Sequence, residues 1–219
     1  MWEPGEQGLN RFRVSGWSME VACDPSGVRL AAVHDDDSSS TTALAGLISM
    51  PDSPLPLLTE QFVRGDEFHL AMPQSGADNA GLDIAITVIL ADHDQFIVET
   101  TVSLQTLWLD VYPAVALHVP GTGGIRHQPR SSAIVFSRAQ SDSRHDSASV
   151  RVFVDVRDQV SLIADASHDE CVQFFGDFME KGVIRKVQPW WVWSRKELTE
   201  TQCNQIADSL AKRPLPLAT

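Results

Sequence analysis

Short runs of apolar residues dominate the chain up to about residue 165, and this pattern most constrains the fold. Some runs alternate with polar residues, as Val102 and Leu104 do around Ser103, and others are rich in β-branched side chains. Both patterns, bounded by turn residues, are typical of strands. We therefore expect about ten strands, over residues 13–21, 28–34, 42–49, 67–72, 82–90, 96–104, 115–119, 133–138, 150–156 and 160–164.

Turn and loop sequences separate these runs. The sequence Asp24-Pro-Ser-Gly27 places Pro second and Gly last, and residues 91–95 join two alternating runs, so both segments predict hairpins. The polar stretches 34–41 and 140–147 are expected to be loops. The Gly- and Pro-rich stretch 120–131 is either a boundary between two lobes or a long loop inside one domain that spans residues 1–219.

After residue 165 the spacing of apolar residues changes to three and four, which predicts helix. Residues 167–170, Ser-His-Asp-Glu, match a capping box, and Gly182 supplies a helix end. The apolar face between them consists of Val172, Phe175, Phe178 and Met179.

A strand over 183–194 is expected next, and a second capping box at 199–202 then begins another helix, which Pro214 and Pro216 end. Its apolar face consists of Cys203, Ile206, Ala207 and Leu210. The predicted fold class is therefore α+β: antiparallel, β-rich sheets of about ten strands followed by a C-terminal helix-strand-helix unit.

Acidic residues are concentrated in the first half of the chain. The 219 residues include 29 acidic and 17 basic side chains, for a net charge of −12. Residues 1–110 carry 17 acids and 4 bases, whereas residues 111–219 carry 12 acids and 13 bases. Because acidic surfaces repel phosphate backbones, we expect no nucleic-acid partner. Solubility explains such acidity most simply, and a cationic partner is the alternative.

The cysteines and the N-terminal sequence suggest a compartment. Cys23, Cys171 and Cys203 are odd in number, far apart and outside any CxxC motif, so we expect reduced thiols and neither a disulfide framework nor a zinc site. The acidic N-terminal sequence does not match a signal peptide. The apolar runs fall far short of the roughly 20 residues that a membrane helix needs. We therefore expect a soluble, cytoplasmic protein without membrane contact.

Scattered short runs resemble a group of uncharacterised bacterial proteins. They are Glu180-Lys-Gly-Val-Ile-Arg185, the tail Pro214-Leu-Pro-Leu-Ala-Thr219, Val63-Arg-Gly-Asp66 and Ser103-Leu-Gln-Thr106. The group has no known activity, so the resemblance implies no cofactor, partner or site residue.

The Gly-rich stretch is the first candidate site, because backbone N–H groups of such a turn can bind an anion. It lacks the Lys-Ser/Thr of a P-loop, and a strand follows it where a phosphate site would have a helix. The candidate anion-binding residues are Gly121, Gly123, Gly124, Arg126, His127 and Arg130.

Four adjacent His and Asp groups invite a metal or catalytic hypothesis: 34–35, 92–94, 145–146 and 168–169. Adjacent residues on a strand point to opposite faces, and neither HExxH nor a calcium-loop pattern is present. A GxSxG elbow is also absent. We therefore expect no metal site, no cofactor and no catalytic residue, and we expect residues 92–94 to form an exposed hairpin tip.

Three tryptophans, Trp190, Trp191 and Trp193, form the most unusual local feature. In an extended segment Trp191 and Trp193 share one face and Trp190 lies on the other. Packing beneath the second helix is one way to cover Trp190. A subunit interface is another, because Trp is common at interface hot spots. Carbohydrate stacking is a third.

The function expected from these features is that of a non-catalytic interaction or assembly module, acting as a homo-oligomer or with a protein partner. The alternative is a small-molecule or anion-binding protein, or an enzyme, with its site at Gly121–Arg130. Convergence of Arg126, His127 and Arg130 in a pocket would favour the alternative, and their dispersal would favour the module.

Overall fold

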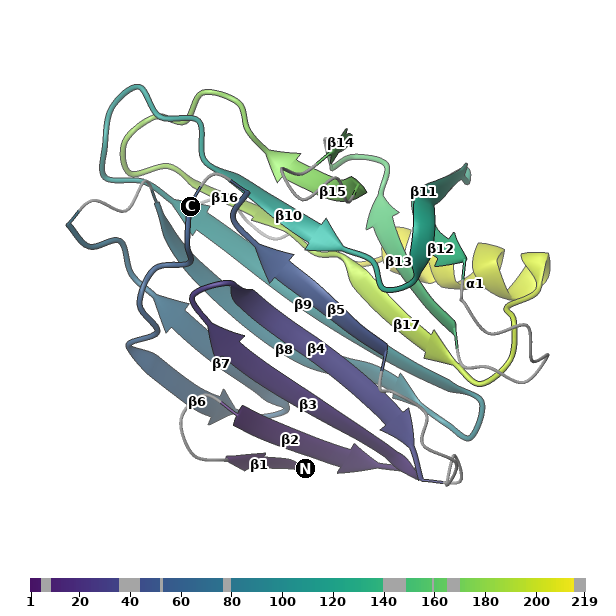
Figure 1. Ribbon diagram of the computed structural model, residues 1–219. Helices are drawn as coiled ribbons and strands as arrows, with labels where there is room; N and C mark the ends of the chain where they lie inside the picture. The colour runs from purple at the N-terminus through teal and green to yellow at the C-terminus, as the bar shows by residue number, and fades with distance from the viewer. Residues whose placement is uncertain are drawn as a thin grey trace.

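The alternating runs form two antiparallel sheets that lie face to face (Figure 1). The structure is a computed structural model that describes residues 1–4, 9–35, 44–51, 53–76, 80–139, 149–158, 160–164 and 170–214. Within these ranges the chain forms 17 strands and one helix. Two sheets that bury a shared apolar layer make a β-sandwich.

The first sheet, sheet A, contains eight strands. In spatial order they are β1 (Trp2–Pro4), β2 (Leu9–Val14), β3 (Trp17–Asp24), β4 (Gly27–His34), β5 (Leu44–Ser49), β10 (Ala114–His118), β15 (Glu170–Phe175) and β14 (Val160–Ala164). Strands from both halves of the chain therefore meet in this sheet, at the β5–β10 pairing, and β15 pairs with β10 in turn.

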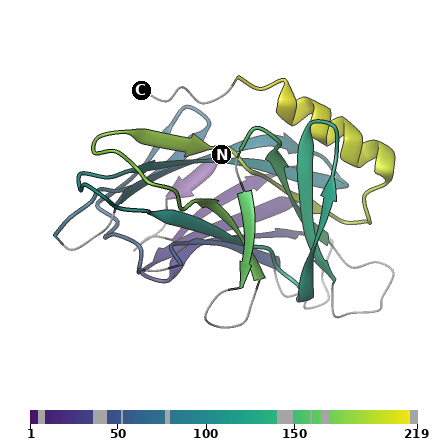
Figure 2. The same cartoon turned by 90° about the horizontal axis from the view of Figure 1, so that it is seen from above.

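The second sheet, sheet B, holds the remaining strands. Its order is β11 (Thr122–Pro129), β12 (Ala133–Ala139), β13 (Ser149–Asp155), β17 (Trp190–Ser194), β9 (Gln95–Gln105), β8 (Gly81–Ala91), β7 (Glu67–Met72) and β6 (Glu60–Arg64). Strand β16 (Ile184–Val187) pairs with the end of β9 beyond β17. Helix α1 (Glu200–Ala211) lies on the side of sheet B that faces away from sheet A (Figure 2).

Aromatic rings fill the layer between the sheets. Trp17 of sheet A stacks on Phe96 of sheet B with ring centroids 5.6 Å apart. Phe96 lies 6.0 Å from Trp193, which lies 6.2 Å from Trp191. All four side chains are almost completely buried. This row of rings joins the two sheets through their largest side chains.

A smaller apolar cluster lies beneath α1 on the outer face of sheet B. It contains Trp190, Phe153 and the predicted apolar face of the second helix. The predicted capping box is present, since the Thr199 hydroxyl accepts the backbone N–H of Gln202. The second helix and its buried face are therefore confirmed.

The predicted α+β fold class is wrong, because the C-terminal helix-strand-helix unit does not form. Glu170–Phe175 is strand β15, which hydrogen-bonds to both β10 and β14. Phe175 and Gly176 have φ values of +63° and +82°, so the backbone turns where the helix would continue. The apolar spacing that indicated a helix combines two strand positions, buried Val172 and half-buried Phe175, with a following loop in which Phe178 is 43% exposed.

Other element boundaries also differ from expectation. Ser15 and Gly16, with φ values of +50° and +80°, split the predicted strand 13–21 into β2 and β3. The predicted strand 183–194 is two strands, β16 and β17. The hairpins at Asp24–Gly27 and 91–95 are confirmed. The expected loop at 140–147 and most of the one at 34–41 lie outside the described residues.

Gly46 of sheet A lies directly under the indole of Trp191. A Cβ added at this glycine would be 2.6 Å from Cη2 of Trp191 and closer still to Cζ3. We expect Gly46→Ala to lower the free energy of unfolding by about 1 to 3 kcal/mol through overpacking. Denaturant melts should show a smaller loss in the Trp191→Phe background, because the shorter ring leaves space. Equal losses in both backgrounds would contradict this contact.

The turn after β13 holds two carboxyl groups with opposite behaviour. Burial, followed by the nearby Asp155 carboxylate, raises the pKa of Asp158 to about 6. Hydrogen bonds from Arg157 lower the pKa of Asp155. The Arg157 Nε and backbone N–H groups both donate to Asp155 Oδ1 at 2.8 Å. The folded state therefore holds a proton on Asp158 that the unfolded chain releases near pH 4.

As the pH rises from about 4 to about 6, the unfolding free energy should fall, because the unfolded chain releases the Asp158 proton at a lower pH than the folded protein does. We expect Asp158→Asn to raise the unfolding free energy at pH 7 by about 1 to 2 kcal/mol, allowing for solvent screening, with the gain vanishing below about pH 4. Asp155→Asn should lower the unfolding free energy at pH 7, since it removes the carboxylate charge that the Arg157 hydrogen bonds stabilise. Urea melts from pH 3.5 to pH 7.5 measure both, and a pH-independent effect of Asp158→Asn would refute the assignment.

Candidate functional site

The Gly-rich stretch forms an edge strand. Thr122–Pro129 is β11, paired only with β12 among the described strands, with a register shift between Thr122 and Arg126. Gly121 precedes the strand with φ +132°, and Gly123 and Gly124 lie within it. Most of the stretch 120–131, expected to be a lobe boundary or a long loop, is therefore a strand.

The backbone of this strand already binds a carboxylate of the same chain. The N–H of Ile125 donates to Glu170 Oε2 at 2.5 Å. A Cβ at Gly124 would lie 3.2 Å from that oxygen, so glycine allows the close approach. Arg138 also donates to the backbone oxygen of Glu170. These contacts tie β11 and β12 of sheet B to β15 of sheet A.

The three basic residues of the candidate anion site do not converge. Arg126 and His127 are both exposed, and as neighbours on a strand they leave opposite faces. Arg130 forms an ion pair with Glu200 at the start of α1, and its Nη2 donates to Gln128 Oε1 at 3.1 Å. Arg130 therefore holds the helix against the sheet edge.

The tryptophan run is buried on both faces of sheet B, as its alternation predicts. Trp191 and Trp193 lie in the core between the sheets, and Trp190 lies beneath α1. Trp190 Nε1 donates to Glu99 Oε2 at 2.8 Å, and Trp191 Nε1 donates to Thr100 Oγ1 at 3.1 Å. The three indoles are at most 3% exposed, so they offer no surface for a subunit contact.

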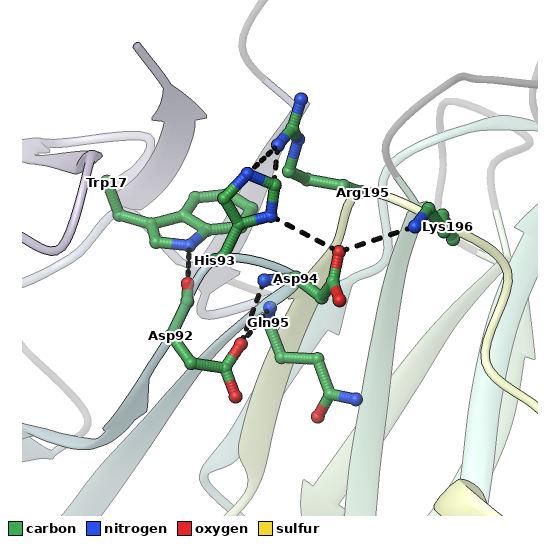
Figure 3. Close-up of polar contacts among 7 residues, drawn as sticks. All are labelled: Trp17, Asp92, His93, Asp94, Gln95, Arg195 and Lys196. Atoms are coloured by element: carbon green, nitrogen blue, oxygen red, sulfur yellow. Dashed lines mark hydrogen bonds and ion pairs between the residues drawn. The ribbon is translucent and has the colours of Figure 1, made fainter. Parts of the chain in front are cut away.

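The hairpin tip at 92–94 joins a polar corner of the sandwich (Figure 3). Asp92 Oδ1 accepts the backbone N–H groups of Asp94 and Gln95, which closes the turn. The Trp17 indole reaches across from sheet A and donates to the Asp92 carbonyl oxygen at 2.7 Å. The tip is therefore connected to both sheets.

Charged groups surround the same tip. Arg195 Nη1 lies 2.9 Å from His93 Nε2, and Lys196 lies 3.7 Å from the Asp94 carboxylate. The His93 side chain is 70% exposed. In the described ranges no group of three or more His, Cys, Asp or Glu side chains is arranged to hold a metal. The pairs at 145–146 and 168–169 lie outside those ranges.

The three cysteines are free thiols, and Cys171 and Cys203 are buried. Burial, with a smaller effect of Asp24, raises the pKa of Cys23 to about 11. The thiolate that a nucleophilic cysteine needs is therefore disfavoured at Cys23.

The feature that sequence analysis missed is an exposed apolar surface at one end of the sandwich. Two loops build it, at 106–113 and 176–183, and each passes from one sheet to the other (Figure 1). We call it the loop patch. Its side chains are 37 to 71% exposed and belong to Leu107, Trp108, Leu109, Tyr112, Phe178 and Val183.

Backbone hydrogen bonds hold the two loops together. The N–H of Met179 donates to the Val111 oxygen at 3.1 Å, and the N–H of Gly182 donates to the Thr106 oxygen at 2.8 Å. The rings of Tyr112 and Phe178 meet edge to face at 6.0 Å. Ordered backbone therefore displays these side chains, as a preorganised binding surface requires.

The local signal for this surface is present in the sequence. Leu107-Trp-Leu109 and the single tyrosine follow a strand whose alternation ends at Gln105. Because the chain leaves β9 of sheet B here and next enters sheet A at β10, these apolar side chains do not continue the buried layer of either sheet. Only the assignment of consecutive strands to different sheets would have revealed this.

In the described part of the chain, no helix has the length and apolarity to cross a membrane. No family model matches the sequence, and no curated protein matches it. One similar solved structure is that of "Heparinase III-BT4657 gene product, Methylated Lysines". The two share 10% sequence identity at a TM-score of 0.50 over 90% of this chain. This chain covers 36% of that protein, so the likeness concerns the sandwich fold alone.

Proposed function

We propose that the protein is a non-catalytic interaction module and that the loop patch is its docking surface. The observation that carries the proposal is the exposure of six large apolar side chains on two hydrogen-bonded loops. Trp and Tyr are the residues most enriched at binding hot spots. Exposed apolar patches on soluble proteins commonly mark protein interaction sites.

Charge favours a partner other than a second copy. The patch loops carry the exposed carboxylates Asp110, Asp177 and Glu180 beside Lys181. A second copy would bring these acids, and a further net charge of −12, against the first. We therefore assign the patch to a different protein whose binding surface has an apolar centre and a basic rim.

The remaining contacts support this choice over the alternatives. The homo-oligomer expectation depended on tryptophans that are buried within the chain. The alternative site at Gly121–Arg130 loses support, because Glu170 occupies its backbone donor and Glu200 pairs with Arg130. We further propose a reducing compartment such as the cytoplasm, which the three free thiols support. Acidity argues against nucleic acid as the partner.

Leu109→Asp should weaken partner binding at least tenfold, because it places a charge on the most exposed apolar side chain of the patch. Leu109 is 71% exposed, so the unfolding free energy should stay within about 0.5 kcal/mol of wild type. Val63→Asp on β6 is the matched control, since Val63 is an exposed apolar side chain outside the two loops.

The measurement begins with the proteins that the wild type captures, whether or not either variant retains them. Each candidate is then purified and its Kd measured at two salt concentrations. We expect equal Kd values for the wild type and Val63→Asp, and weaker binding at higher salt. A partner that binds Leu109→Asp normally would contradict the patch. Sedimentation showing a dimer that Leu109→Asp dissociates would replace the heterologous partner with a second copy.

A further inference from the structure

A second concave feature lies far from the loop patch, beside helix α1. A pocket of about 350 Å³ opens between α1 and the outer faces of β8 and β9. Its apolar lining, called the floor below, consists of Ile89, Leu90, Ile97, Trp190 and Ile206. The volume lies at the small end of the range for ligand sites, about 300 to 1,000 Å³.

Uncharged polar groups form the rim of this pocket. Gln95 comes from β9, and Gln202, Gln205 and Ser209 come from α1. The amide oxygen of Gln202 accepts the Thr199 N–H at 2.9 Å, which leaves its NH2 group as a donor. The Ser209 hydroxyl donates to the Gln205 backbone oxygen at 2.8 Å, which leaves its lone pairs as acceptors. The rim can therefore both donate to and accept from a ligand.

The carboxylate that contacts Trp190 is paired within the protein. Glu99 is 4% exposed and lies opposite Trp190 in the strand register. Its carboxylate accepts Trp190 Nε1 at 2.8 Å and Arg213 Nε and Nη2 at 3.0 and 2.7 Å. A charge paired in this way cannot compensate the desolvation of an ionic ligand.

We propose that this pocket binds a small uncharged molecule with an apolar body and a hydroxyl or amide edge. Every residue that lines it is uncharged, in a chain with 29 acidic side chains. Water above the isoleucine side chains has few hydrogen-bond partners, so an apolar ligand body that displaces this water gains binding free energy. The polar edge meets the glutamine and serine groups of the rim. An ion of the same size would lose its hydration without gaining a counter-charge.

Three probes that share a phenyl ring and are similar in size separate the effect of shape from that of charge: benzyl alcohol, benzoate and benzylammonium. We expect benzyl alcohol to shift the Trp190 indole and Gln95 amide signals in NMR spectra saturably, with a Kd of about millimolar order for so small a molecule. Both ions should bind at least tenfold more weakly. Equal binding of all three, or no saturable shift with benzyl alcohol, would overturn the proposal.

A filled pocket provides the control. Gln205 is exposed on α1, so Gln205→Trp should fill the mouth without opening the core and should abolish the benzyl alcohol shifts. Thr201→Trp, an exposed position on α1 outside the lining, should leave them unchanged. Ser209→Phe is the second filling variant should Gln205→Trp fail to fold. Retention of the shifts in a folded filling variant would place the binding elsewhere and refute the site.

Discussion

The row of rings from Trp17 through Phe96 and Trp193 to Trp191 is the interaction on which the rest of the structure depends. It crosses from one sheet to the other, and both sheets must approach closely enough to enclose it. The close approach requires a residue without a side chain at Gly46, directly under Trp191. The polar ends of buried indoles must also be satisfied. Trp17 and Trp191 meet this condition with bonds to Asp92 and Thr100.

The need to bury apolar side chains between the sheets also explains where the loop patch lies. Apolar residues on β9 enter the core in alternation until Gln105, where the chain leaves for sheet A. Leu107, Trp108 and Leu109 follow at this crossing and remain exposed, although hydrogen bonds to the neighbouring loop fix their backbone. The five other tryptophans are buried and serve the fold, whereas Trp108 is displayed. This separation of buried and displayed indoles is the structural argument for a binding module.

Elements whose structure depends on local chemistry could be predicted from the sequence. The turn at Asp24–Gly27, the alternation in β8 and β9 and the capping box at Thr199 form as their residues predict. Elements whose structure depends on pairing with distant strands could not. The segment from Glu170 has helix-like apolar spacing, yet hydrogen bonds to strands distant in sequence make it β15. The anion hypothesis identified a backbone N–H that does bind a carboxylate, but the carboxylate belongs to Glu170, 45 residues away.

The rates of hydrogen exchange at the six indole N–H groups, resolved by NMR, test most directly whether the aromatic row holds the sheets together while the loop patch stays exposed. Trp190 and Trp191 donate to internal acceptors in buried surroundings, so both should exchange only when the protein unfolds globally. Trp108 is 51% exposed and should exchange close to the rate of an unprotected indole. Protection of Trp108 equal to that of Trp191 would show that the loop patch is covered. Rapid exchange of Trp191 would show that the aromatic row does not hold the sheets together.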